Sequence, residues 1–203
     1  MTQEPATASA WNIANVLTGL RIVLVPVFVV LMAMDHQNYG GYRWAAVVVF
    51  AIAVYTDKLD GDIARARNLV TSFGKIADPI ADKLLMGSAL VVLSLLGELW
   101  WIVTIVILVR EVGITIMRFW VIRWGVIAAS AGGKIKTVAQ ALGTFILLLP
   151  WAPEHLWVAI IGWIVIGIAT LLTLYSAIDY VRQAITLYRE HQARGGKTVT
   201  DAA

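Results

Sequence analysis

The chain has 203 residues, of which 60% are hydrophobic and only 14% are charged, and it contains nine tryptophans. This composition excludes an ordinary soluble domain and predicts an integral membrane protein. The absence of cysteine excludes disulfides, thiolate metal sites and cysteine catalysis. A net charge of +3, with no basic face interleaved with aromatic residues, excludes a nucleic-acid partner.

Apolar segments recur along the whole chain, each long enough to cross about 30 Å of hydrocarbon as a helix of roughly 20 residues. We therefore expect an all-α fold with six transmembrane helices. The expected spans are 13–34, 44–66, 75–97, 100–122, 134–151 and 157–181. They form one membrane domain, 1–185, and a polar tail, 186–203, which we expect to fray into the cytoplasm.

The basic residues predict the orientation, because cytoplasmic connections carry an excess of Lys and Arg. Alternate junctions and the tail contain Lys58, Arg65, Arg67, Lys75, Arg118, Arg123, Lys134, Lys136, Arg182, Arg189, Arg194 and Lys197. The opposite connections contain only Arg43. Both termini of this multi-pass chain are therefore expected in the cytoplasm. Expected anchors at the outer interface are Trp44, Trp100, Trp101, Trp151 and Trp157.

One acidic stretch, "YTDKLDGDIARARNLVTSFGKIADPIADKLL" at residues 55–85, contradicts its apolar surroundings. Helical spacing predicts one shared face for Asp57, Asp60, Gly61 and Ala64, and another for Gly74, Asp78 and Asp82. The connection between the two spans is short, which makes them antiparallel neighbours. Four carboxylates are therefore expected to converge at the cytoplasmic end of the second and third spans.

Converging carboxylates need positive charge, because two like charges 4 Å apart repel by about 4 kcal/mol at an effective dielectric constant of 20. All-oxygen ligands favour two divalent cations, Mg²⁺ or Mn²⁺, and such a pair suits transfer of a phosphoryl-type group. Gly61 and Ala64 leave room for a base or a pyrophosphate, which Arg65 would clamp. The alternative is a cation or proton carrier, but carriers are expected to show inverted repeats, and no internal repeat is visible.

The segment "DKLDGDIARARNLVTSFGKIADPIAD" resembles the signature of the CDP-alcohol phosphotransferase family. Every defining position matches: Asp57, Asp60, Gly61, Ala64, Arg65, Gly74, Asp78 and Asp82. The resemblance implies a six-helix membrane fold, usually dimeric, with a site near the cytoplasmic face. It further implies that Asp57, Asp60, Asp78 and Asp82 hold two divalent cations, that Asp82 is the base, and that Gly61, Ala64, Arg65 and Gly74 bind the CDP-linked donor.

Basic residues of the later spans are candidates for binding an anionic acceptor: Arg110, Arg118, Lys134 and Lys136. Arg110 lies within an apolar run, where insertion scales give a penalty of about 2.5–3.5 kcal/mol for an unpartnered cation. We expect it to pair with an acid on another span or with substrate phosphate. Glu111 is adjacent in sequence, so we expect it to point elsewhere on the helix. For Arg118, Lys134 and Lys136, the positive-inside rule is an alternative explanation.

The chain from "NIANVLTGLR" to about residue 150 resembles the phosphatidylglycerophosphate synthases within this family. Asn15, Thr18 and Arg21 match their opening pattern and are expected beside the nucleotide or behind the metal ligands. Arg21 lies within an apolar span, so we expect it, like Arg110, to need an interior partner. This resemblance implies transfer of a phosphatidyl group from CDP-diacylglycerol to sn-glycerol 3-phosphate, with Asp82 deprotonating the acceptor hydroxyl. Inositol phosphate and phosphatidylglycerol remain alternative acceptors.

Overall fold

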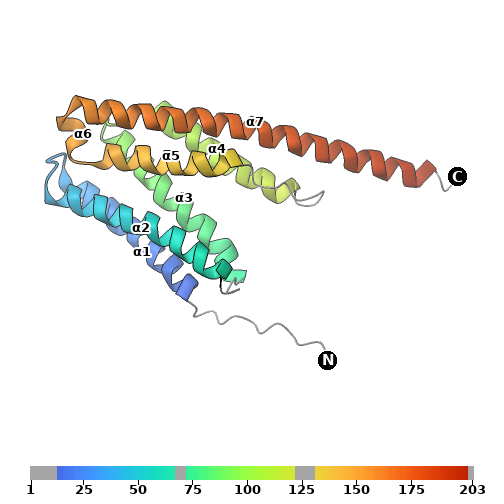
Figure 1. The fold of residues 1–203 in the computed structure, drawn as a ribbon, viewed down its shortest axis with the longest axis horizontal. Coiled ribbons are helices and arrows are strands. Elements are labelled where there is room, and N and C mark those ends of the chain that lie inside the picture. Colours follow the sequence, from blue (N-terminus) through green and yellow to red (C-terminus); the bar gives the residue numbers. More distant parts are fainter. Residues whose placement is uncertain (1–12, 67–71, 122–130, 201–203) are drawn as a thin grey trace.

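The computed structural model describes the backbone of residues 13–66, 72–121 and 131–200, and the side chains of 16–57, 59, 80–121, 135–189, 191 and 192. Every element in these ranges is a helix (Figure 1). The helices are α1 (Ile13–Asp35), α2 (Gly41–Ala66), α3 (Ser72–Leu95), α4 (Trp101–Val121), α5 (Ala131–Leu148), α6 (Trp151–Glu154) and α7 (Leu156–Thr200). The predicted all-α fold is confirmed.

The last helix departs from the prediction, because α7 continues to Thr200 and the expected fraying of the tail is wrong over residues 186–200. Good helix formers such as Leu187, Arg189, Gln192 and Ala193 lie at the start of this part of the sequence, and side chains one turn apart support the helix. Gln183 Nε2 donates to Asp179 Oδ2 at 2.8 Å, and Gln192 Nε2 donates to the Tyr188 hydroxyl at 2.7 Å. The single-turn helix α6 was also not predicted and lies within the connection "PWAPEH".

The helices form two arms that meet at one end of the molecule (Figure 1). In one arm α1 packs against α2, and in the other α7 packs against α4 and α5. Helix α3 joins the arms, because it contacts α1, α2, α4 and α5. The arms meet at the end that contains α6, here called the closed end, and separate toward the open end, where α1 begins and α7 ends.

The closed end is held by short turns and an apolar core. The Asp35 carboxylate accepts from the backbone N–H groups of Tyr39 and Gly40, each at 3.2 Å, and Gln37 Nε2 donates to the Leu96 carbonyl at 2.8 Å. The turn between α3 and α4 needs a glycine, because Gly97 has φ +75°, a backbone conformation that other residues rarely adopt. The core beneath includes Phe28, Phe50, Leu93, Leu148 and Ile166. These contacts fix the closed end.

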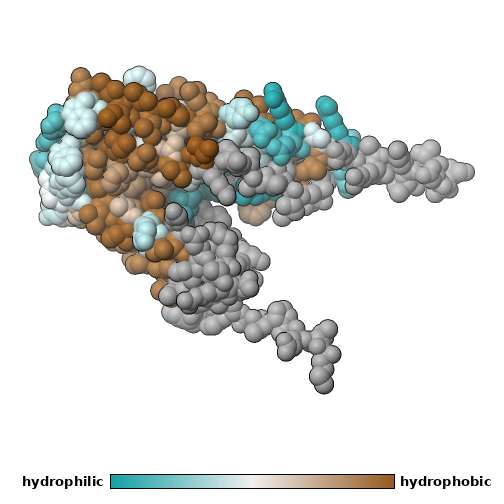
Figure 2. Space-filling model, in the orientation of Figure 1, coloured by the Kyte–Doolittle hydropathy of each residue, from teal (hydrophilic) through white to brown (hydrophobic). Residues whose placement is uncertain are grey.

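The outer surface of the helices is apolar (Figure 2). Many large hydrophobic side chains are exposed there, including Val109, Ile116 and Leu171, each more than 60% accessible. Soluble monomers rarely expose such a continuous apolar surface. Within the described residues, Val16–Asp35 and Leu156–Arg189 are long and apolar enough to cross a membrane by themselves, and Ile135–Leu148 is a shorter apolar helix.

Candidate functional site

Two of the predicted metal ligands approach each other from neighbouring helices. Asp57 lies on α2 and Asp82 on α3, and the charge of Asp57 acts on the Asp82 carboxylate. Asp60 and Asp78 lie on the same two helices, but their side chains are outside the described residues. The same holds for the predicted donor-binding positions Gly61, Ala64, Arg65 and Gly74. The described part of the acidic site is therefore the pair Asp57 and Asp82.

Arg21 neutralises part of this acidic site from α1. Its Nη1 lies 2.7 Å from Asp57 Oδ1, and its side chain is completely buried, whereas that of Asp57 is 40% exposed. Thr18, one turn earlier on α1, is also buried, while the Asn15 side chain lies outside the described residues. The sequence predicted that Arg21 needs an interior partner, and Asp57 is that partner. Arg21 thereby holds a predicted metal ligand from behind.

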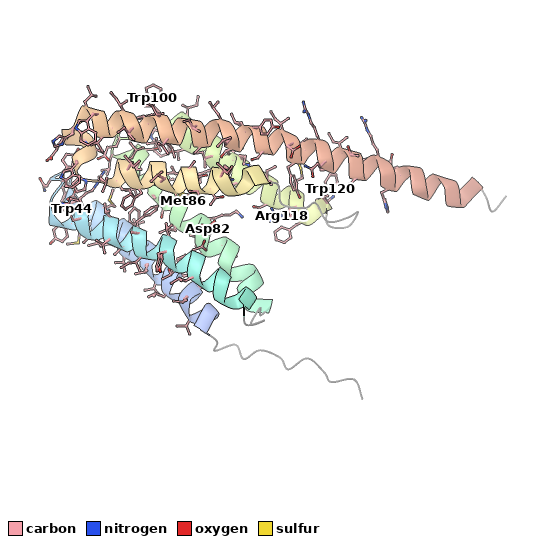
Figure 3. The ribbon with its side chains drawn as sticks, in the orientation of Figure 1. Trp44, Asp82, Met86, Trp100, Arg118 and Trp120 are labelled. Atoms are coloured by element: carbon pink, nitrogen blue, oxygen red, sulfur yellow. The ribbon has the colours of Figure 1, made fainter. Side chains whose placement is uncertain are left out.

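Asp82 faces a cavity of about 320 Å³ between α3, α4 and α5. Figure 3 shows Asp82 and Met86 on successive turns of α3, in the space between the two arms. The polar lining includes Lys83, Glu111 and Lys136, and Met86 belongs to the apolar wall. Among the side chains that the structure describes, none donates a hydrogen bond to Asp82. A carboxylate that lines a cavity in this way is suited to meet a ligand.

A chain of charged side chains links α4, α5 and α7 beside the cavity. Glu111 Oε1 accepts from Arg110 Nη1 at 3.0 Å and also from Lys136 Nζ. Arg110 Nη2 donates to Ser176 Oγ at 2.7 Å. The expectation that Glu111 points away from Arg110 is therefore wrong. Both side chains are long enough to bend toward the neighbouring helices, where Lys136 and Ser176 provide partners.

Of the predicted acceptor-binding cations, the structure brings Lys136 to the Asp82 cavity. Arg110 does not line this cavity, since Glu111 stands there and Arg110 lies behind it. Arg118 is exposed in the last turn of α4 (Figure 3), and the Lys134 side chain is outside the described residues.

Among the charged residues of the cavity lining, sequence reasoning missed Glu111 and Lys83. Glu111 carried a usable signal, because an acid within an apolar run needs a cation on another helix. Lys83 follows Asp82 directly and gave no such signal.

The residues present suit a hard divalent cation. In the described part of the chain no three potential ligands gather around one point, but the Asp60 and Asp78 side chains lie outside that part. The described pair, Asp57 and Asp82, supplies carboxylate oxygens and places two negative charges near each other. Oxygen ligands and excess negative charge are what Mg²⁺ and Mn²⁺ sites provide.

Known proteins are similar in sequence to this chain over most of its length. The family model of the CDP-alcohol phosphatidyltransferases matches residues 11–175. A Mycobacterium tuberculosis protein named probable phosphatidylglycerophosphate synthase is 47% identical over 175 residues, which cover 86% of this chain and 82% of that protein. The CDP-diacylglycerol–glycerol-3-phosphate 3-phosphatidyltransferase of Salmonella typhimurium is 36% identical over 182 residues, covering 86% and 95%.

Proposed function

The chain belongs to the CDP-alcohol phosphatidyltransferase family, and from this premise we propose that it transfers the phosphatidyl group of CDP-diacylglycerol to sn-glycerol 3-phosphate. The products are phosphatidylglycerophosphate and CMP. The observation that carries the proposal is the pair Asp57 and Asp82 on adjacent helices, with Asp82 facing a cavity that also contains Lys136. The names of the relatives support this donor and this acceptor.

In the proposed reaction Asp82 takes the proton from the primary hydroxyl of glycerol 3-phosphate. The oxygen then attacks the phosphorus that bears diacylglycerol and forms a new P–O bond. The bond between this phosphorus and the bridging oxygen of the pyrophosphate breaks, and CMP leaves with that oxygen. The proton remains on Asp82 until water removes it, so the site returns to its starting state.

Two divalent cations, Mg²⁺ or Mn²⁺, are proposed to be held by Asp57, Asp60, Asp78 and Asp82. When bound, they would neutralise the charge of the pyrophosphate and of the departing CMP. Arg21 keeps the Asp57 carboxylate in place through the 2.7 Å contact. The proposed donor-binding residues are Gly61, Ala64, Arg65 and Gly74. For the acceptor phosphate we propose Lys136, which lines the Asp82 cavity, together with Arg118 and Lys134, whereas Arg110 lies behind Glu111 and supports it.

We further propose that the six long helices all cross the membrane, with both termini and the site at the cytoplasmic side of the cell membrane. Support comes from the fold, in which α1 begins and α7 ends at the same open end (Figure 1). The predicted interfacial tryptophans 44, 100, 101, 151 and 157 are all exposed, as anchors at the other side would be. The family resemblance leads us to expect a homodimer.

The test is release of CMP from CDP-diacylglycerol by the purified protein with Mg²⁺ or Mn²⁺. Glycerol 3-phosphate, inositol phosphate, free inositol, serine and phosphatidylglycerol are offered separately, with and without chelator. We expect release with glycerol 3-phosphate alone and none after chelation. Release with another acceptor instead would overturn the acceptor and keep the chemistry. No release with any acceptor, by folded protein, would reject the transferase in favour of a carrier.

A further inference from the structure

Glu111 contacts two of the cations that the sequence predicted to bind the acceptor, Arg110 and Lys136. Its Oε1 accepts from both Arg110 and Lys136, and its side chain lines the cavity that Asp82 faces. We propose that Glu111 is a positioning residue that orients the Lys136 ammonium group for the phosphate of the acceptor. This inference rests on the proposed function, since it concerns the same acceptor.

Lys136 needs such a partner because of where it lies. It is 6% exposed, and Glu111 is its hydrogen-bond acceptor within the described residues. A lysine side chain is a flexible stem with a compact charge, so a fixed carboxylate is required to hold the ammonium group in one place. A buried ammonium group without a counter-ion is also strongly disfavoured. Glu111 therefore fixes the position of the Lys136 ammonium group and stabilises its positive charge.

Glu111 is itself held in place from the side away from the cavity. Arg110 Nη1 binds its Oε1, and Arg110 Nη2 donates to Ser176 Oγ on α7 at 2.7 Å. The Ser176 hydroxyl in turn donates to the Thr173 carbonyl at 3.0 Å. The series Ser176, Arg110, Glu111 and Lys136 runs from α7 through α4 to α5. Such a continuous series restricts each member to one orientation.

The cavity gives this orientation a chemical meaning. The charges of Glu111 and Asp57 both act on the Asp82 carboxylate, and the charge of Asp82 acts on Lys136. An acceptor with a phosphate at one end and a primary hydroxyl at the other could place the phosphate on Lys136 and the hydroxyl beside Asp82. Orienting Lys136 thus aligns the acceptor for deprotonation, which is how positioning contributes to catalysis.

The experiment compares Glu111→Gln with Glu111→Asp and with Glu98→Gln. Glu98 pairs with the buried Arg43 at the closed end, so Glu98→Gln removes the same charge from a buried arginine far from the cavity. For each variant the KM for glycerol 3-phosphate, the KM for CDP-diacylglycerol and kcat are measured. Thermal stabilisation of the purified protein by glycerol 3-phosphate is the second readout.

We expect Glu111→Gln to raise the KM for glycerol 3-phosphate roughly 10-fold, because losing a hydrogen bond to a charged group has an effect of about this size. The KM for CDP-diacylglycerol and kcat at saturating acceptor should stay within about two-fold. Glu111→Asp keeps the charge and should recover part of the loss, and it serves as the test variant if the glutamine variant does not fold. Glu98→Gln should lower stability and leave the KM for the acceptor unchanged.

The opposite results separate this inference from the proposed function. An unchanged or lower KM for glycerol 3-phosphate in folded Glu111 variants, with normal wild-type turnover, would overturn the positioning role alone. Equal increases of the KM for glycerol 3-phosphate in Glu111→Gln and Glu98→Gln would show that Glu111 only stabilises the fold, and would also overturn the positioning role. Wild-type protein that is neither active with glycerol 3-phosphate nor stabilised by it would overturn the proposed acceptor, and the role of Glu111 with it.

Discussion

The two ends of the bundle each bury an arginine beside a carboxylate, yet the two arginines have different surroundings. At the closed end Arg43 is fully buried and binds both carboxylate oxygens of Glu98. Its Nε also donates to the Leu148 carbonyl at 2.8 Å, and its guanidinium lies over the Tyr39 ring, 5.6 Å from the centroid. This network joins α2, the α3–α4 turn and the end of α5.

Toward the open end Asp82 keeps capacity to bind a ligand. Arg21 Nη1 lies 2.7 Å from Asp57 Oδ1, and the Asp57 side chain remains 40% exposed. Asp82 faces the cavity and accepts no hydrogen bond from the side chains that the structure describes. A saturated buried network rigidifies a fold, whereas an acid that faces a cavity, as Asp82 does, marks a place for a ligand. The comparison indicates that the buried charges at the closed end stabilise the fold, whereas those toward the open end are arranged to bind a ligand.

The largest expected effect is on turnover, from Asp82→Asn. Loss of a general base alone reduces the rate by roughly 10²–10⁴-fold, and here the residue is also a proposed metal ligand. The thermal unfolding midpoint should not fall, because the change removes a negative charge from beside Asp57. CMP release and thermal unfolding are the measurements. Asp179→Asn on α7, away from the cavity, is the matched control, and full activity of Asp82→Asn would refute its assignment as the base.

Glu98→Gln should give the reverse pattern at the closed end. It leaves the buried Arg43 without a counter-ion, which typically destabilises a protein by about 3–5 kcal/mol. We expect a clear fall in the thermal unfolding midpoint, with wild-type turnover in the protein that remains folded. Glu154→Gln, an exposed acid of α6 at the same end, is the control and should be silent. Unchanged stability of Glu98→Gln would show that the network is dispensable.

A smaller effect is expected from Arg21→Lys, which keeps the charge and loses the planar guanidinium. Residues that hold a metal ligand from behind usually contribute about 10–100-fold in metal affinity or activity. The concentration of Mg²⁺ or Mn²⁺ needed for half-maximal CMP release should rise accordingly, while stability changes little. An unchanged metal requirement would mean that Asp57 needs no support from Arg21, and would leave the 2.7 Å contact with a structural role only.

Two strong signals in the sequence predicted the helices and the neighbouring positions of Asp57 and Asp82. The lengths of the apolar runs predicted the long helices, and helical spacing predicted that Asp57 and Asp82 lie on helix faces that meet. The insertion penalty correctly predicted that Arg21 has an interior partner. These successes share a cause, because a charged group in an apolar segment has few ways to be accommodated.

The contacts of Glu111 and the burial of Arg43 could not be predicted, because they depend on partners that sequence spacing does not reveal. The penalty argument was applied to Arg110 and not to Glu111, although an acid in the same apolar run also needs a cation. Lys136 then supplied that cation from another helix. Arg43 was counted as a loop residue of the outer side, whereas it is fully buried. Tertiary contacts between distant segments decided both cases.

The smallest expected effect tests whether the two ends are coupled through α5. Gly143 lies on α5 between Lys136 and Leu148, and a Cβ added there would meet the Ile166 backbone nitrogen at 2.8 Å. Gly143→Ala must therefore push α5 away from α7, with a cost of about 1–3 kcal/mol for overpacking. Gly167→Ala is the control, because no atom lies within 4 Å of its added Cβ and a helical alanine gains about 0.5–1 kcal/mol.

If the ends are independent, Gly143→Ala lowers the unfolding midpoint and leaves the KM for glycerol 3-phosphate unchanged. A raised KM would show instead that the position of Lys136 depends on how closely α5 packs on α7, so that the closed end helps set the geometry of the cavity.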